Sequence, residues 1–482
     1  MGLLRADGSQ QLSCRCTCYR SSPMLANRKQ AKPGSLPRWL AIVWMTCLAG
    51  CGEIVPERPN VLIYVVSSLR ADALGVYDPE RKNTPHFDEF ATSGAIFEAA
   101  YSSSSWSRPA MASMLSGLYP WHHGVLGLDD GLPSSVPNLA RSFSAHGYTS
   151  ALITANPNVG PLFGFDQGFD ESIELYSRSQ KGRVQEHELI AGSEIVTRVA
   201  LKWIDERPQP FFLVVLAVDP HAPYLPPRSY DPAHFRARSG ANGRITSLDR
   251  LSKSRRPDDE ARIRELYQAE VGFSDNSFGE LVAELRRRGE LDRTVVVLTS
   301  DHGEAFWEYD LQGHGKSLSR EVLHIPLAIR YPRAKQLPPG VRTPMPISLV
   351  DLAPTLLELA GLPLPTDLDG RSFFESAIRA RSPILAGLDT PEHRLLAAIE
   401  EPYKLLWDRE LGEISLFDMR LTRPESAPFD PRSDETARAA HARLMTALSE
   451  GLRVRDEAIS GGAPGSLPPD IEDDLRSFGL SP

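Results

Sequence analysis

Residues 295–316 read VVVLTSDHGEAFWEYDLQGHGK, and this stretch decides both the fold and the chemistry that the chain is expected to have. Its apolar start leads directly into Asp301 and His302, as in a buried strand with polar side chains at its C-terminal end. His314 and Lys316 follow after a short connection. Asp and His side by side can hold a divalent cation, while a second His with a Lys can bind an anionic ester. The stretch therefore predicts hydrolysis or transfer of a sulfate or phosphate ester.

Further apolar runs rich in Val, Ile and Phe alternate with segments of helical pattern, which is typical of an α/β sheet covered on both faces. The expected fold is α/β, with a large central, mostly parallel or mixed sheet flanked by helices. The strands are predicted at 61–66, 151–154, 211–218, 294–298 and 325–329, and the helices at 84–93, 261–288 and 351–360.

The C-terminal part has a different pattern. Short strands are predicted at 393–400, 402–408 and 413–417, followed by an Ala-rich helix at 435–450. We expect a small antiparallel sheet plus helix, and the predicted division is a catalytic α/β domain at 58–380, a C-terminal subdomain at 381–455 and a tail at 456–482. The charged, Gly-rich stretch at about 237–260 is predicted as a mobile surface insertion.

The first fifty residues have the pattern of a bacterial lipoprotein signal. Basic residues precede an apolar run at 39–50, which is too short to span a bilayer but suits a signal peptide. The run ends at Cys51 in a sequence that resembles a lipobox, where the Cys is diacylated. An ordinary signal peptide or an uncleaved anchor is the alternative, and residues 1–23 are not translated if Met24 is the start. The expected location is the bacterial cell envelope, lipid-anchored and facing the periplasm or the exterior.

Cysteine content and charge exclude several classes of protein. All five Cys lie between residues 14 and 51, so the mature domain has no disulfide framework and no thiol nucleophile. Beyond residue 50 the chain carries 46 basic and 61 acidic residues, a net charge of −15. This argues against nucleic acid as a partner and leaves the lipid anchor as the expected contact with a membrane.

Five segments, in order, resemble the sulfatase family within the alkaline phosphatase superfamily. Their order and spacing agree with the family over about residues 58–425. The segments are 58–72 (RPNVLIYVVSSLRAD), 107–117 (SRPAMASMLSG), 219–224 (DPHAPY), 300–304 (SDHGE) with 313–316 (GHGK), and 403–405 (YKL) with 416–418 (LFD).

The resemblance implies that Ser107 occupies the position of the nucleophile. Pro109 suits the first position of a helix, so Ser107 would lie beside free backbone N–H groups that stabilise an alkoxide. The family's formylglycine motif has an Arg where this chain has Met111, so formylglycine is not expected here. An unmodified Ser lacks the exit by which a formylglycine expels sulfate, but it can pass a phosphoryl group to water or to an alcohol. The alternative is that Ser107 only caps a helix.

The metal site departs further from the family pattern. The resemblance implies a divalent cation, Ca²⁺ above all, held by two Asp of the first strand together with Asp301 and His302. Those two positions are Ser67 and Ser68, whose neutral hydroxyls are poor ligands for a hard cation. We therefore expect weak binding or loss of the cation, unless the nearby Asp72 compensates.

Residues that would contact the anion are better retained. The resemblance implies contacts of His221 with the ester and of His314 and Lys316 with substrate oxygens and the leaving group. Each His at a strand end is alternatively a structural residue. The family's Lys-Trp-His motif is missing at 155–157, where Asn156 is expected to bind the substrate as a neutral donor.

The sequence thus predicts a sulfatase-like hydrolase of sulfuric or phosphoric esters outside the cytoplasm. Its expected partner is a sulfated or phosphorylated small molecule, glycan or lipid head group. Two alternatives remain open. One is a non-catalytic protein that binds such a group, which Ser67 and Ser68 favour, and the other is a phosphoryl head-group transferase.

Overall fold

The computed structural model describes residues 58–176, 190–231, 240–375 and 383–452. The predicted signal with Cys51 and the predicted tail at 456–482 lie outside these residues. Within the described ranges, no helix is both long and apolar enough to cross a membrane.

The main sheet has eight strands in the order β12-β2-β11-β7-β1-β6-β4-β5. At its centre, β1 pairs in parallel with both β6 and β7, whereas β11 runs antiparallel to β7 and β2. The sheet is therefore mixed, and the predicted α/β class is confirmed. Its strands are β1 (Asn60–Val66), β2 (Ala95–Phe97), β4 (Thr149–Thr154), β5 (Glu171–Glu174), β6 (Phe211–Ala217), β7 (Thr294–Thr299), β11 (Leu327–Arg330) and β12 (Arg342–Thr343).

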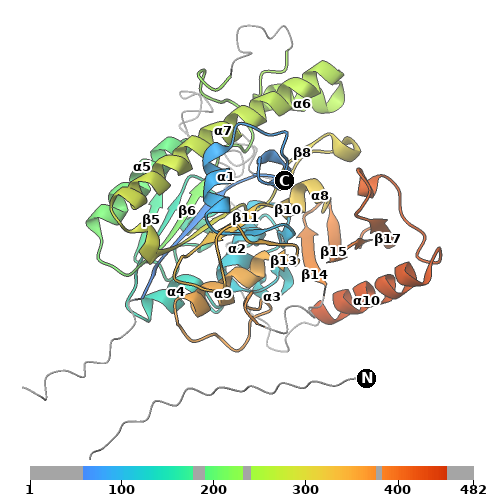
Figure 1. Ribbon diagram of the computed structural model, residues 1–482. Coiled ribbons are helices and arrows are strands. Elements are labelled where there is room, and N and C mark those ends of the chain that lie inside the picture. The colour runs from blue at the N-terminus through green and yellow to red at the C-terminus, as the bar shows by residue number, and fades with distance from the viewer. Residues whose placement is uncertain (1–57, 177–189, 232–239, 376–382, 453–482) are drawn as a thin grey trace, which may run out of the picture. The chain divides into compact units, whose positions relative to one another are not determined.

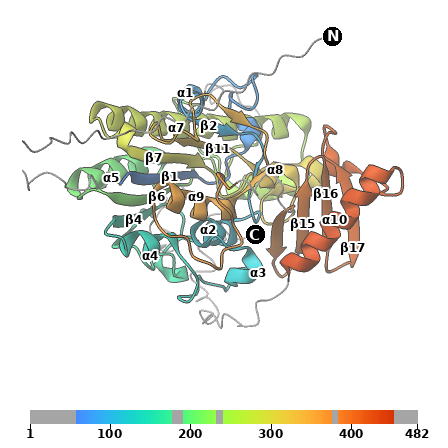
Figure 2. The ribbon, with the colours of Figure 1, turned by 60° about the horizontal axis from the view of Figure 1, so that its bottom comes forward.

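Helices cover both faces of this sheet (Figures 1 and 2). Alternate residues of β1 point into two apolar clusters, so that Ile63 packs on one face and Tyr64 on the other. Every residue of β1, β6 and β7 is buried, and these strands are apolar except for Asn60, Thr294 and Thr299 at their ends. One face is covered by α2 (Ser107–Ser116), α4 (Leu139–Ser144) and α9 (Leu352–Leu359), and the other by α1 (Pro85–Thr92), α5 (Ser193–Glu206) and α7 (Pro257–Arg287).

A second sheet of four antiparallel strands follows in the C-terminal part, with helix α10 (Glu435–Gly451) packed on it through apolar residues (Figure 2). Three of its strands, β15 (Arg394–Glu400), β16 (Tyr403–Asp408) and β17 (Glu413–Asp418), match the predicted ones. The fourth, β14 (Ile384–Asp389), was not predicted.

Two sequence predictions were wrong in detail. The strand expected at 325–329 is two strands, β10 (His324–Ile325) and β11, in different sheets, because Pro326 has no N–H to continue a ladder. The stretch at 237–260 contains helix α6 (Ile245–Lys253), whose Leu248 and Leu251 are buried, and it overlaps the start of α7. Residues 232–239 lie outside the described ranges.

The remaining short elements fill the connections. They are β3 (Ala100–Tyr101), β8 (Ala305–Phe306), β9 (Gln312–Gly313), β13 (Ile347–Ser348), α3 (Pro120–His123) and α8 (Arg320–Leu323).

Candidate active site

The parallel strands bring the predicted site residues to one edge of the main sheet. Ser67 follows β1, Asn156 follows β4, His221 follows β6 and Asp301 follows β7, each near the C-terminal end of its strand. Helix α2 starts beside them at Ser107. Since parallel strands end on the same side, residues far apart in the sequence meet there.

Ser107 is the first residue of α2, two positions earlier than the helix start predicted from Pro109. Trp106 occupies the N-cap position, and no side chain caps the helix. The Ser107 hydroxyl instead lies 3.2 Å from His302 Nε2 and accepts a 3.0 Å hydrogen bond from Asn156 Nδ2. It is 2% exposed and lies at the positive end of the helix. Its hydroxyl therefore faces the site and does not serve as a helix cap.

Three imidazoles lie in a row beside Ser107. The ring centroids of His302 and His314 are 4.3 Å apart, and those of His314 and His221 are 4.7 Å apart. Each Nδ1 lies close to an oxygen that can only accept, so in a neutral ring Nδ1 carries the proton and Nε2 keeps its lone pair. The Nδ1 contacts are His302 with Gly303 O (2.8 Å), His221 with Ala222 O (2.5 Å) and His314 with Glu304 Oε1 (3.1 Å).

Burial keeps two of these rings neutral. It lowers the pKa of His221 to about 3, with a further decrease from His314. Burial also lowers the pKa of His314 well below its usual range, and the charges of His302 and Lys316 add to the effect. Lys316 itself is exposed, and its ammonium group donates to Gln312 O at 3.2 Å. The site thus combines neutral imidazoles with one ammonium group at its edge.

The side chains at the implied cation site do not fit a hard divalent ion. The carboxylate of Asp301 already accepts from Ser67 Oγ (3.0 Å), Ser68 N (3.2 Å) and its neighbour's main-chain N–H (2.9 Å). Burial raises the pKa of Asp301, but His302 and the hydroxyls of Ser107 and Ser67 lower it by more. The pKa of Asp301 is therefore below its usual value. Across the described ranges, no three His, Cys, Asp or Glu side chains are grouped so that they could hold a metal.

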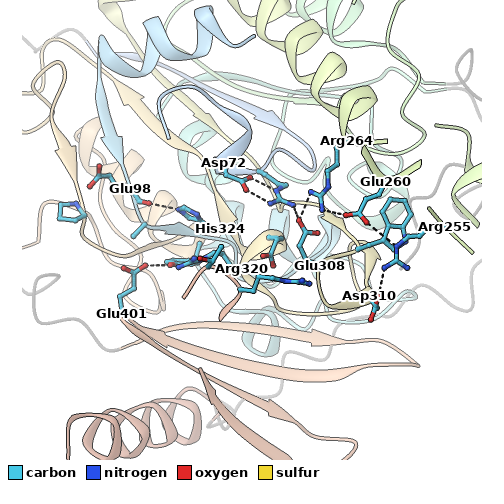
Figure 3. Close-up of a pocket in the computed structure, with 18 residues that line it drawn as sticks. Asp72, Glu98, Arg255, Glu260, Arg264, Glu308, Asp310, Arg320, His324 and Glu401 are labelled. Atoms are coloured by element: carbon cyan, nitrogen blue, oxygen red, sulfur yellow. Dashed lines mark hydrogen bonds and ion pairs between the residues drawn. The ribbon is translucent and has the colours of Figure 1, made fainter. Parts of the chain in front are cut away.

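Asp72 does not compensate for the missing carboxylates. It forms a bidentate ion pair with Arg70 at 2.8 and 2.6 Å. That pair lines a cavity of about 1000 Å³ that is separate from the residues listed above (Figure 3).

The cavity has a wall of alternating charges. Arg70 also contacts Glu308 at 2.8 Å, and the chain of ion pairs continues through Arg264, Glu260 and Arg255 to Asp310. Figure 3 shows the side chains from Glu308 through Arg264, Glu260 and Arg255 to Asp310 turned toward one another along the wall. Neither Ser107 nor any of the three histidines described above lines the cavity, so it is not the active site.

Glu304 is the residue that sequence analysis missed. It was quoted within SDHGE but was given no role, although its carboxylate contacts His314. The available signal was its position, because a Glu inside a buried stretch needs a polar partner.

Known proteins resemble this chain in sequence. The family model described as Sulfatase matches residues 59–362. An ulvan-active sulfatase of Formosa agariphila is 27% identical over 370 residues, covering 70% of each chain. A human N-acetylglucosamine-6-sulfatase is 25% identical over 409 residues, covering 73% of this chain and 71% of the relative.

Solved structures share the fold. A phosphonate monoester hydrolase of Agrobacterium radiobacter superposes with a TM-score of 0.66 at 22% identity, covering 82% of this chain and 96% of that one. A protein solved in complex with its substrate, D-glucosamine-2-N,6-O-disulfate, gives a TM-score of 0.65 at 19% identity, covering 82% and 97%.

Proposed function

The chain belongs to the sulfatase family, and on this basis we propose that it hydrolyses sulfuric or phosphoric esters with an unmodified Ser107 as nucleophile. The observation that supports this most is the position of the Ser107 hydroxyl between His302 Nε2 and Asn156 Nδ2 at the start of α2. A nucleophile within reach of a base, at a helix N-terminus, is the arrangement that ester transfer requires.

In the first step, Ser107 Oγ attacks the sulfur or phosphorus of the ester, and its proton passes to His302 Nε2. The bond to the ester oxygen breaks, and this oxygen takes a proton from Lys316 as the alcohol leaves. His221 and Asn156 lie beside the group that is transferred, where they bind and orient it.

In the second step, water attacks the same atom and gives its proton to His314 Nε2. The bond to Ser107 Oγ breaks by this direct displacement and not by the collapse that is open to a formylglycine. Ser107 regains its proton from His302, and sulfate or phosphate is released. The proton on His314 returns to Lys316 through solvent. Each group then has its starting protonation state.

The sulfatase family generally uses a divalent cation. For this chain we propose that Ca²⁺ binds weakly or not at all, since Ser67 Oγ and the main-chain N–H of Ser68 donate hydrogen bonds to the Asp301 carboxylate. A cation that did bind would meet Asp301 and His302 and would help to neutralise the anionic ester.

The names of relatives suggest the class of substrate. An ulvan-active sulfatase and a structure with a disulfated glucosamine both concern sulfated sugars. We propose a sulfated or phosphorylated glycan, small molecule or lipid head group as substrate, and a location in the bacterial cell envelope with Cys51 as the lipid anchor.

The second candidate is a non-catalytic protein that binds the same kind of anion. The hydrogen bond from Ser67 to Asp301 favours it, because this bond lies where the family resemblance implies metal ligands.

One experiment separates the two candidates. Residues 52–482 are purified, bound metal is measured by mass spectrometry, and aryl sulfate, phosphate monoester and phosphodiester substrates are assayed beside Ser107→Ala. We expect turnover of at least one substrate and a loss of about 1000-fold or more in Ser107→Ala. Equal activity of the two proteins, or none in either, contradicts the catalytic proposal.

A further inference from the structure

The three histidines differ in what fixes their orientation. For His221 and His302, the Nδ1 partner is the main-chain carbonyl of Ala222 or Gly303, which any side chain at these positions would provide. For His314 the partner is the side chain of Glu304. The orientation of His314 is therefore the one that depends on the identity of a second residue.

Burial of the Glu304 side chain costs free energy unless its carboxyl group is hydrogen-bonded. Its side chain is fully buried, and a buried carboxylate is stable only where hydrogen bonds replace water. Oε1 meets His314 Nδ1 at 3.1 Å, and the buried hydroxyl of Tyr224 interacts with the same carboxyl group. Burial raises the pKa of Glu304, while His221, His302 and Tyr224 oppose this rise. The contact with His314 is the hydrogen bond that ties this carboxyl group to a ring of the candidate site.

The backbone around Glu304 is fixed on both sides. Arg70 Nη1 donates to the Glu304 carbonyl at 3.0 Å, and Gly303 N donates to Val322 O at 2.9 Å. On the C-terminal side, β8 pairs with β9, which leads into His314. The carboxylate and the imidazole are consequently presented to each other by two paired segments.

We propose that Glu304 is a positioning residue, which accepts the Nδ1–H of His314 and keeps the Nε2 lone pair of that ring free to take the proton of the attacking water. In that step a water O–H bond breaks, its proton goes to Nε2, the water oxygen bonds to sulfur or phosphorus, and the Ser107 Oγ bond to that atom breaks. The catalytic consequence rests on the proposed function, whereas the orientation of His314 does not.

Two variants distinguish the hydrogen-bond acceptor of Glu304 from its negative charge. Glu304→Gln keeps an oxygen that can accept from Nδ1 but removes the charge, and Glu304→Leu removes both. Glu321→Gln is the control, because Glu321 is a partly buried acid of the neighbouring segment. Its Oε2 lacks a partner within the described residues, and its side chain lines the separate cavity. Thermal unfolding of each variant establishes that it is folded.

The orientation of the His314 ring is measured directly, by a method that needs no enzymatic turnover. Two-bond proton–nitrogen spectra of ¹⁵N-histidine-labelled protein, with His314 assigned through His314→Gln, report which ring nitrogen carries the proton. We expect Nδ1–H in the native chain, in Glu304→Gln and in Glu321→Gln, and a change toward Nε2–H in Glu304→Leu. Nε2–H in the native chain, or Nδ1–H retained in folded Glu304→Leu, overturns the proposal.

Kinetics then test whether Glu304 acts through His314. We expect kcat to fall about 100-fold in Glu304→Leu with KM little changed, by less in Glu304→Gln and not at all in Glu321→Gln. Adding Glu304→Leu to His314→Ala should cost nothing further, whereas a separate structural role would give additive losses and would overturn the proposal. If the native chain has no activity, the spectra still decide the orientation, so failure of the proposed function and failure of this inference give different results.

Discussion

The hydroxyl of Ser67 donates a 3.0 Å hydrogen bond to Oδ2 of Asp301, and this bond links the C-terminal ends of the two central strands β1 and β7. A second carboxylate at position 67 would repel Asp301 unless a cation lay between them. The serine removes the need for that cation and satisfies the carboxylate in its place.

Restoring the acids should therefore restore a requirement for metal. We expect the double variant Ser67→Asp, Ser68→Asp to melt below the native chain in chelator, because three carboxylates meet, and to gain several degrees on addition of Ca²⁺. The native chain and a Ser67→Asn, Ser68→Asn control should not respond to Ca²⁺. Differential scanning calorimetry measures all three, and an unresponsive double variant would show that the pocket cannot hold the ion.

Ser107 should remain a serine in the mature protein. Met111 stands where the family's modification motif has an Arg. Peptide mass spectrometry over residues 107–117, on protein made in a host that contains the modifying enzyme, should give the unmodified mass. A peptide lighter by about two daltons would reveal formylglycine and would contradict this prediction.

The imidazoles of His221 and His314 should stay neutral as the pH falls from about 7 to about 5, the range in which an ordinary His gains its proton. Burial lowers the pKa of His221 to about 3 and lowers that of His314 as well, so both rings stay neutral and able to accept through this range. Proton–nitrogen spectra of ¹⁵N-histidine-labelled protein across this pH range measure this. Protonation of either ring near an ordinary histidine pKa would contradict the prediction.

Gly303→Ala should destabilise the protein severely. A Cβ at Gly303 would lie 2.1 Å from the carbonyl oxygen of Glu321, and this backbone cannot move away without breaking the Gly303–Val322 hydrogen bond. We expect a loss of more than about 3 kcal/mol in the free energy of unfolding. Gly412→Ala is the control. A φ of 71° is strained for alanine, but the added Cβ would meet nothing within 4 Å. This substitution should cost about 1–2 kcal/mol. Urea denaturation compares them, and equal losses would contradict the close-approach explanation.

Much of the fold could be predicted because a strand that is buried on both faces appears in the sequence as an almost continuous apolar run. This held for β1, β6 and β7, whose residues are all buried. It failed at 325–329, where an apolar run contains Pro326 and the chain changes sheets. It also failed at α6, where only Leu248 and Leu251 are apolar enough to mark a buried face among charged neighbours.

The candidate site was predictable as a set of residues but not as a set of contacts. Sequence order placed Asp301, His302 and His314 in one motif, whereas the bond between Ser67 and Asp301 spans 234 positions. Glu304 was overlooked for a related reason. Its proposed role depends on its burial and on its contact with the His314 ring, and a sequence motif shows neither.

The C-terminal sheet contacts the loop that carries His314, a candidate catalytic residue. Lys404 of β16 is fully buried, donates to the carbonyl of Leu318 just beyond GHGK and pairs with Glu425 at 2.9 Å. Glu425 in turn accepts from Tyr309 at the other side of the loop. The family model ends at residue 362, before both of these residues. A recombinant fragment that ends at that boundary would contain all the candidate catalytic side chains. It would lack Lys404 and Glu425, whose contacts hold the loop in place. Inactivity of such a fragment would therefore not show that the full chain is inactive.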